Sequence, residues 1–586
     1  MKTALLLHSV KEAEHCVRLR LHEQALVLST DPAVDVYLSE IHGIDCRCLS
    51  QFLSHEEFSA LRERASRAAD RLLAALDDRL APALNERLGL KMRYFSPLYS
   101  YFGKHYLLGQ LAFVESLRKV VAAHGVNVVR YCRSPYQIFL DVDPDIGRLL
   151  AQITSPVQGE PIEYSAPSVA RLGFGARLRR FVATGRPRAL LRGTAKAAVR
   201  YFAAAPKAAG RRTILLAEPL YDFDFLKAAL GDYDLLMCGQ DGRIMNPGQE
   251  IAEPLPDLRD IIERLPDDAG DPDERLLLSG IGPDFARRFS RYVGPVLALR
   301  RVREKRRISL GVWGNIGGFE KYLLFEYLRS EGVPIVGTQH GNSYVDQIAP
   351  LILDSDFRRC DHFVSWGFDA EDLKRSFPGA SIKMEVYPMG MSTPPRPTAG
   401  GREIDVVFPL TLGMTLFNGG GARTKPDVLL ERQRRILERL NSLEGRSVYV
   451  KLFPFLPTER CAVAPLLKRM KNLKVADDMY FEEFLKTHRP RAVVIDYPAS
   501  ALFQTANLDT EIFLLPDELN PYEGRALAEL KKRVHYCENS DALDAALDLF
   551  FKGKLESKRG REYSDHYICR PGARENTVRL IRQLAG

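Results

Sequence analysis

Residues 335–344 read Ile-Val-Gly-Thr-Gln-His-Gly-Asn-Ser-Tyr, and this stretch indicates the fold class of the chain. Its apolar start has the composition of a buried strand, and the strand ends abruptly in a polar cluster. In open α/β sheets, ligands bind beyond the carboxyl ends of parallel strands, where loops and helix starts converge. The stretch therefore predicts a strand that delivers polar groups to a binding site. The candidate residues are Gln339, His340, Gly341 and Asn342.

The sequence on both sides of this stretch continues the same alternation of strand and helix. "TILLAEPLYDFDF", "ISLGVWGNIGG" and "HFVSWG" belong to one series, and "IDVVFPLTLG", "RSVYVKLFP" and "TEIFLLPDE" belong to a second. A Pro/Gly-rich break between Met391 and Ile404 separates the two series. We therefore predict an α/β fold with two Rossmann-like domains facing a cleft, one over residues 1–395 and the other over residues 400–586.

Helical insertions are expected in the first of these domains. Short apolar runs at "TALLLH", "ALVLST" and "DCRCLS" precede a long helical pattern over residues 55–80, in which apolar residues recur at helical spacing. More helix follows in "YLLGQLAFVESLRKVVAAHG", which leads into the strand candidate "VNVVRYCRS". Strands that alternate with helices indicate a parallel sheet covered by helices.

Composition limits the class of protein. The chain has 586 residues, of which 46% are hydrophobic and 27% charged, so it is long enough for several folded cores. Its nine cysteines are scattered, without the paired spacing of a zinc site or a disulfide framework, which favours a reducing compartment. The apolar run before His8 is too short for a signal peptide, and no stretch reaches the ~20 apolar residues of a membrane span. We therefore expect a cytoplasmic protein.

A basic segment interrupts the first domain at about residues 165–212. It contains twelve basic residues between Arg171 and Arg212, no acidic residue, and interleaved aromatic and aliphatic side chains. One interpretation is an amphipathic segment that brings the protein to the anionic inner face of the cytoplasmic membrane. The alternative is a solvated helical linker. Because the segment lacks a regular stacking pattern, no nucleic-acid partner is expected.

Two further strand ends carry groups suited to phosphate. Lys451 leaves the stretch "VYVKLFPF" as a point charge that can meet a monophosphate or diphosphate. In "VVIDYPASALFQ", Asp496 ends a β-branched strand, and Ser500 with the amides around Ala501 begins a helix, where N–H groups favour an anion. Ser500 is equally well explained as an N-cap.

Other acidic and glycine-rich positions are weaker candidates. "GVWGNIGGFEKYL" places Gly317 and Gly318 between a strand and a helix, with Glu320 as a candidate base, although tight packing explains the glycines as well. Asp241 follows another strand and can act as a nucleophile, or it belongs to an ordinary Asp-Gly turn. Asp-x-Asp pairs, such as Asp141 with Asp143, are expected by chance, so neither a metal nor another cofactor is expected.

The order of these motifs resembles a known group of enzymes. Strand-Gln-His-Gly, then Lys-x-x-Pro, then Asp-Tyr-x-x-Ser is similar to bacterial surface-carbohydrate transferases known mostly from genomes of spirochaetes and other bacteria, with "VGTQHGNSY" and "CDHFVSWGF" as the nearest matches. The resemblance runs from about residue 305 to the end of the chain. It extends more distantly to Kdo transferases and teichoic-acid glycerophosphotransferases, which have GT-B folds and release CMP.

This resemblance implies a role for each matching residue. His340 would be the catalytic base or a contact to the reacting phosphate, Ser500 with Ala501 would hold the donor phosphate, and Lys451 would neutralise the leaving group. The second domain would then bind the nucleotide donor and the first the acceptor. Two positions depart from the relatives: Phe453-Pro454 replaces their His-Pro, and Gln504 stands where they carry an acid that can bind ribose.

Three functions follow as hypotheses. The first is a metal-independent glycosyltransferase that moves a sugar from a nucleotide-activated donor, with a CMP-sugar favoured, to a bacterial surface polysaccharide or lipid-linked glycan. The second is a phosphotransferase that uses a CDP-linked polyol. The third, based on the basic segment alone, is a non-catalytic binding protein.

Overall fold

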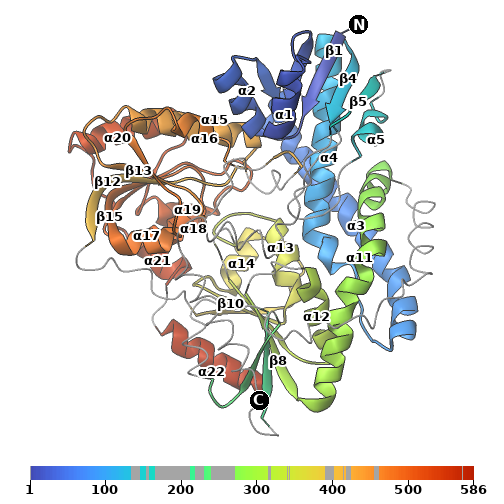
Figure 1. Ribbon diagram of the computed structural model, residues 1–586. Coiled ribbons are helices and arrows are strands. Elements are labelled where there is room, and N and C mark those ends of the chain that lie inside the picture. Colours follow the sequence, from blue (N-terminus) through green and yellow to red (C-terminus); the bar gives the residue numbers. More distant parts are fainter. Residues whose placement is uncertain are drawn as a thin grey trace, which may run out of the picture.

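Three parallel β-sheets covered by helices make up the computed structural model (Figure 1). The structure describes residues 2–132, 145–153, 157–164, 211–217, 230–238, 271–314, 319–339, 341, 344–389, 401–413, 415–417, 424–454, 461–569 and 572–586. Every strand pair within these residues is parallel. Helical crossovers therefore link the strands, as parallel pairing requires.

The first sheet is formed by the N-terminal part of the chain and has the strand order β3-β2-β1-β4-β5. Its central strand contains "ALLL", all of it buried, which is the continuous apolar pattern of a strand covered on both faces. The strands are β1 (Lys2–Leu7), β2 (Ala25–Ser29), β3 (Cys46–Cys48), β4 (Val126–Cys132) and β5 (Gln158–Ile162), and the short helices are α1 (Val10–Arg18), α2 (Pro32–His42) and α5 (Ile146–Leu150).

Three long helices from the first two sheets pack against one another. They are α3 (His55–Leu88), α4 (Pro97–His124) and α11 (Pro272–Lys305), which contact one another and lie side by side in Figure 1. α3 begins where Ser54 and Glu57 form a capping box, and it ends at Gly89, whose left-handed φ of 61° suits glycine. The predicted helix over residues 55–80 is confirmed and extends further.

The second sheet contains the quoted stretch and has the order β11-β10-β9-β8-β6-β7. A Cβ on Gly337, in the middle of β9, would come within 2.6 Å of Trp313 Nε1 and 2.9 Å of Phe363, so close packing requires glycine there. The strands are β6 (Thr213–Leu216), β7 (Asp234–Met237), β8 (Ile308–Trp313), β9 (Ile335–Thr338), β10 (His362–Ser365) and β11 (Glu385–Pro388), and the helices are α12 (Phe319–Ser330), α13 (Leu351–Ser355), η3 (Phe357–Arg359) and α14 (Ala370–Ser376).

The third sheet has the order β14-β13-β12-β15-β16-β17. Val406, Val450 and Val494, on three of its inner strands, pack in one apolar cluster with the helices α15 (Pro426–Asn441) and α20 (Ser540–Phe551). The strands are β12 (Arg402–Pro409), β13 (Val448–Lys451), β14 (Leu473–Ala476), β15 (His488–Ile495), β16 (Glu511–Leu514) and β17 (His535–Tyr536), and the helices are α15 (Pro426–Asn441), α16 (Ala464–Leu467), α17 (Phe481–Thr487), α18 (Ser500–Thr505), α19 (Gly524–Leu530), α20 (Ser540–Phe551) and α21 (Glu562–Tyr567).

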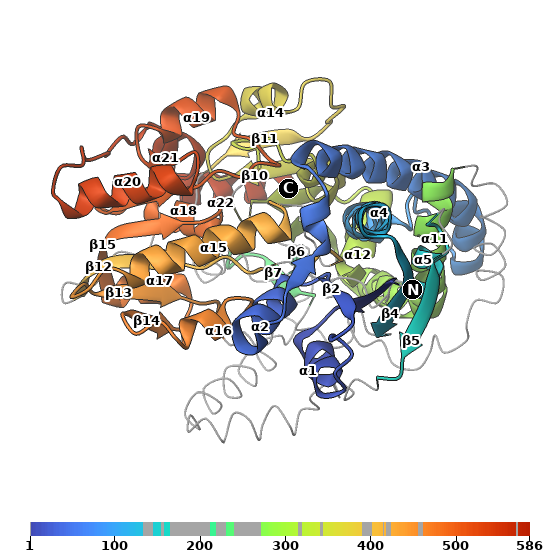
Figure 2. The same ribbon diagram turned by 90° about the horizontal axis from the view of Figure 1, so that it is seen from above.

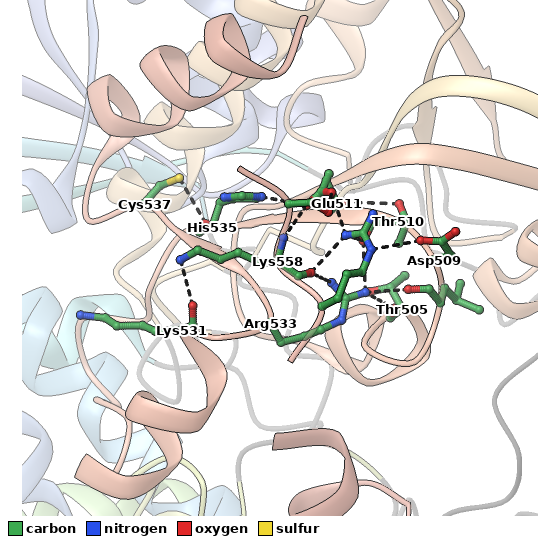
Figure 3. A network of polar contacts seen from close by, with 12 residues as sticks. Thr505, Asp509, Thr510, Glu511, Lys531, Arg533, His535, Cys537 and Lys558 are labelled. Atoms are coloured by element: carbon green, nitrogen blue, oxygen red, sulfur yellow. Dashed lines mark hydrogen bonds and ion pairs between the residues drawn. The ribbon is translucent and has the colours of Figure 1, made fainter. Parts of the chain in front are cut away.

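A buried polar network closes the amino end of β16 (Figure 3). Arg533 is only 2% exposed, and burial lowers the pKa of its guanidinium to about 10. Its N–H groups donate to the carbonyls of Thr505, Ala506, Leu508 and Thr510 at 2.6–3.4 Å. Beside it, Glu511 pairs with the His535 ring at 2.8 Å. This network ties the turn after α18 to the amino ends of β16 and β17.

The helix α22 (Ala573–Ala585) follows the elements of the third sheet in sequence but packs on the second sheet. Val578, Ile581 and Ala585 share an apolar cluster with Ile214 and Val312 of β6 and β8. Figure 1 shows α22 beside β8, apart from the other helices of the C-terminal part. The chain therefore crosses from the second sheet to the third and back.

The predicted α/β fold with Rossmann-like parallel sheets is confirmed. The region assigned to the first domain contains two sheets, because residues 2–162 form a sheet of their own. The predicted boundary between Met391 and Ile404 falls between β11 of the second sheet and β12 of the third, although most of it lies outside the described residues. In the part of the chain that the structure covers, no helix is long and apolar enough to traverse a lipid bilayer.

Candidate functional site

The carboxyl ends of the second and third sheets are joined directly. The loop after β9 pairs with the loop after β16: Gln347 forms a β-bridge with Tyr522, and Ile348 N donates to Pro521 O at 2.8 Å. The Gln347 side chain, fully buried, donates to Asn520 O at 3.2 Å. Two loops that leave the carboxyl edges of two different sheets thus meet at one place.

A second contact joins the same two edges through aromatic rings. Trp366 follows β10, and Phe503 lies on α18, which follows β15. Their ring centroids are 5.4 Å apart at an interplanar angle of 70°. Edge-to-face packing of this kind is favourable between buried aromatic side chains. The same two carboxyl edges are therefore also joined by a buried aromatic contact.

Gln339 shapes the turn in which the predicted histidine lies. Its side chain is 4% exposed; Oε1 accepts from Trp366 N at 2.7 Å, and Nε2 donates to Gly341 O at 2.8 Å. Both ends of this amide are therefore used to fix the backbone of the turn. A Cβ on Gly341 would meet no atom within 4 Å, so this position borders open space.

Asp496 directly follows β15, at the carboxyl edge of the third sheet. It is fully buried, and its carboxylate accepts from the Thr411 hydroxyl and the Gln433 amide, each at 2.7 Å. Burial raises its pKa, and these hydrogen bonds oppose that rise. Asp496 thus links the end of β15 to the loop after β12.

Lys451 lies at the end of β13, as predicted, but its side chain is 3% exposed. Its ammonium donates to the carbonyl of Leu452, and burial lowers its pKa. Because the charged form is costly in this position, an anion next to the ammonium would be stabilised by it more strongly than one at the protein surface.

The start of α18 differs in detail from the prediction. Its N-cap is Ala499, so Ser500 is the first helical residue; its side chain is exposed and does not cap the helix. Ala501 is buried behind it. Gln504 donates to Glu482 Oε1 of α17 at 2.7 Å, so a carboxylate lies beside the position at which the relatives carry an acid. The sequence analysis did not identify Glu482, because it lies 22 residues before Gln504 on another helix.

The carboxyl edge of the first sheet also reaches the third. His8 follows β1 and Thr30 follows β2, and His8 Nδ1 lies 2.8 Å from Thr30 Oγ1. Thr30 O accepts from Leu416 N at 2.9 Å, and the Phe417 ring lies 6.0 Å from the His8 ring. Both Leu416 and Phe417 belong to the loop after β12. The sequence analysis missed this contact, which brings the carboxyl edges of all three sheets toward one region.

Helix contacts reinforce this arrangement. Glu40 of α2 pairs with Arg434 of α15 at 2.9 Å and with Arg469, just after α16, at 3.1 Å. Figure 2 shows α2 beside α15 and α16. The burial of Glu40 is intermediate, so these ion pairs act mainly to orient the first sheet on the third.

Several predicted residues lie outside the described part of the chain. These are His340, Asn342, Asp241, Gly317 and Gly318. Glu320 lies in the first turn of α12, but its side chain is not described. The basic segment over residues 171–210 and the pair Asp141 and Asp143 also lie outside it. Their roles stay predictions.

The fold is α/β and GT-B-like: two Rossmann-like sheets meet at their carboxyl ends, and the last helix returns to the first of the pair. No family model matches the sequence, and no curated protein matches it.

The chain is distantly similar to several solved structures. One is sucrose-phosphate synthase from Thermosynechococcus elongatus, at 12% identity and a TM-score of 0.38, over 64% of this chain and 99% of that chain. Another is MurG of Acinetobacter baumannii, at 10% identity and a TM-score of 0.32, over the same shares. A third is UDP-GlcNAc 2-epimerase of Methanocaldococcus jannaschii, at 11% and 0.37, over 64% and 99%. At these scores, the likenesses carry no argument about activity.

Proposed function

We propose that this chain is a GT-B-type glycosyltransferase that moves a sugar from a nucleotide-activated donor to a glycan or lipid-linked acceptor. The observation that carries the proposal is the junction between the loops after β9 and β16, through Gln347 and Tyr522. Ligands of parallel α/β sheets bind at carboxyl ends. Two such edges held together suit an enzyme that must bring two substrates into contact.

In this proposal the third sheet holds the donor. Lys451 lies next to the leaving phosphate. Asp496 fixes the loop after β12 by accepting hydrogen bonds from Thr411 and Gln433. Glu482, beside Gln504, supplies the carboxylate that binds ribose in the place of an acid at position 504. A buried ammonium stabilises developing negative charge without further reorganisation.

The second sheet then brings the base to the acceptor. The proposed base is His340, in the turn whose two sides Gln339 holds through Trp366 N and Gly341 O. Imidazole is suited to this role because it titrates near neutral pH. The roles of Ser500 and Ala501 in phosphate binding, and of Glu320 and Asp241 in catalysis, are part of the same proposal.

The finer proposal is that the donor is a CMP-sugar and the acceptor a bacterial surface polysaccharide or lipid-linked glycan. It rests on the resemblance of the Gln-His-Gly and Asp-Tyr-x-x-Ser motifs, together with the placement of Gln339 and Asp496 at carboxyl edges. Membrane association through residues 171–212 and independence of metal ions are proposed on the same basis.

A donor screen tests the function. The full chain is incubated with CMP-, UDP- and GDP-sugars and with CDP-linked polyols, and the released nucleotide is measured with and without EDTA. We expect release of CMP from a CMP-sugar, unchanged by EDTA. Release of CMP from a CDP-polyol alone would favour the phosphotransferase. If no donor is consumed and the protein binds RNA in a salt-sensitive manner, the proposal is wrong.

A further inference from the structure

A pocket of about 800 Å³ lies at the amino ends of β9, β10 and β11, at the edge of the second sheet opposite to the candidate functional site. We call it the amino-edge pocket. One wall is the loop between α3 and α4, and the others are the end of α12, η3 and the segment before β11. Its charged lining residues are Lys91, Arg93, Arg329, Arg358, Lys383, Glu326 and Asp361.

Positive charge in this pocket is incompletely neutralised. Both carboxylates of the lining lie near the same cation, since Arg329 is 3.6 Å from Glu326 and 3.5 Å from Asp361. Lys91, Arg93 and Lys383 are exposed and form no ion pair within the described ranges. Three cations on two separate segments therefore face the pocket without a carboxylate partner.

The ring of Tyr94 brings one further cation, Arg359, close to Arg93. The Arg93 guanidinium carbon lies 5.1 Å from the ring centroid, and that of Arg359 lies 5.7 Å from it. Arg359 Nε is buried and has no hydrogen-bond partner. The carboxylates of Glu326 and Asp77 also attract the Arg359 guanidinium, whereas Arg93, among the described residues, has only the ring face, which compensates a guanidinium in part. An anion that reached Arg93 would therefore be stabilised by it.

The loop that carries Lys91 and Arg93 is held rigidly from both sides. Asn85 exchanges two hydrogen bonds with the backbone of Met92, at 2.7 and 2.9 Å. Asp77 accepts from Phe95 N, Ser96 N and the Ser96 hydroxyl at 2.6–2.8 Å. A cation presented by a fixed loop loses less freedom when a ligand binds, which favours affinity.

We propose that the amino-edge pocket binds a ligand that carries phosphate groups, at a site separate from the carboxyl edges where glycosyl transfer is proposed. Guanidinium and ammonium groups on several segments can surround the oxygens of a phosphate from different directions. The ligand is either a soluble phosphorylated compound or the phosphate of an anionic lipid headgroup.

The first test measures binding of inorganic pyrophosphate to the full chain by calorimetry. The pocket variant is Lys91→Gln/Arg93→Gln/Lys383→Gln, and the control variant is Lys468→Gln/Lys471→Gln/Lys554→Gln, which removes three exposed cations from the third sheet's region. We expect Kd to rise at least tenfold in the pocket variant and less than twofold in the control. Equal weakening in both variants, or binding unchanged in the pocket variant, would overturn the proposal.

Two further readouts separate this site from the proposed donor site and identify the source of the phosphate. The pocket variant should release nucleotide from the preferred donor within twofold of the wild type, and loss of that activity would place the anion at the catalytic site instead. Flotation with phosphatidylglycerol vesicles, lost in the pocket variant, would identify a lipid headgroup. Because residues 171–212 are proposed to bind membranes independently, pyrophosphate binding with equal flotation of the wild type and the pocket variant would identify a soluble ligand. The absence of both would refute the site.

Discussion

The Tyr563 hydroxyl donates a 2.9 Å hydrogen bond to the Asp346 carboxylate, although 217 positions separate the two residues in sequence. Both side chains are buried, Asp346 in the loop after β9 and Tyr563 on α21. Glu523 N donates to Asp346 O at 2.9 Å, so the same residue holds the C-terminal part of the chain twice. Asp346 is thus a fixed point between the second and third sheets.

Replacing Asp346 by asparagine should change the pH dependence of stability. Burial raises the pKa of Asp346 to about 6, from an ordinary value of 3.8, so the folded state binds more protons between these values than the unfolded state. The free energy of unfolding should therefore fall as pH rises through this range, by at most about 3 kcal/mol from this group. In Asp346→Asn that contribution disappears. Urea titrations at pH 4 to 7.5 measure it.

The matched control for this experiment is Asp78→Asn, an exposed carboxylate on α3. It should retain the wild-type slope of stability against pH. An identical slope in the wild type and in Asp346→Asn would show that Asp346 is ionised without penalty in the folded protein.

Gly109→Ala should loosen the contact between the first and third sheets. A Cβ at Gly109 of α4 would lie 2.8 Å from Leu416 O and 3.1 Å from Phe417 Cα, both in the loop after β12. We expect a loss of about 1–3 kcal/mol in unfolding free energy. Gly103→Ala, on the same helix, meets its nearest atoms at 3.6 Å and should gain up to about 1 kcal/mol through helix propensity. Equal melting temperatures for the two variants would contradict the contact.

Arg533→Lys tests the network at β16. One ammonium cannot reach the four carbonyls that the guanidinium now binds, from Thr505 to Thr510. We expect a loss of about 3 kcal/mol in unfolding free energy, measured by urea denaturation. Arg561→Lys, in an exposed position, should be neutral. A stable Arg533→Lys protein would mean that these carbonyls need no partner.

Lys451→Met should weaken donor binding and leave the fold intact. Methionine keeps most of the apolar stem and removes a buried ammonium whose pKa is lowered by burial. The melting temperature should not fall, whereas donor affinity should drop about 10- to 100-fold through the lost interaction with phosphate. Lys468→Met serves as the control. Unchanged kinetics with the preferred donor would exclude Lys451 from the site.

His340→Ala should lower kcat by about 10²- to 10⁴-fold if the histidine is the general base. Donor affinity should change little, because the proposed phosphate contacts lie on the third sheet. The melting temperature and kcat are measured on the same preparation, with the surface variant His42→Ala as control. A lower melting temperature with normal turnover per folded molecule would assign His340 a structural role.

Local features of the fold were predictable from the sequence. The apolar spacing over residues 55–80 predicted α3, and the apolar run from residue 335 predicted β9, because each pattern depends on neighbouring residues. Contacts over long separations, such as Gln347 with Tyr522, carry no local signal and were not foreseen. Ser500 was one candidate N-cap, but Ala499 takes that position because the helix begins one residue earlier than this candidate implied, at Ser500 itself.

The return of α22 to the second sheet also sets the order in which the chain can fold during synthesis. Strands β6 and β8 leave the ribosome long before residues 573–585, yet Val578 and Ile581 cover Ile214 and Val312. Until residues 573–585 have been synthesised, Ile214 and Val312 therefore lack the cover that this helix gives them. A nascent chain arrested before residue 573 should consequently bind chaperones that recognise exposed apolar surface.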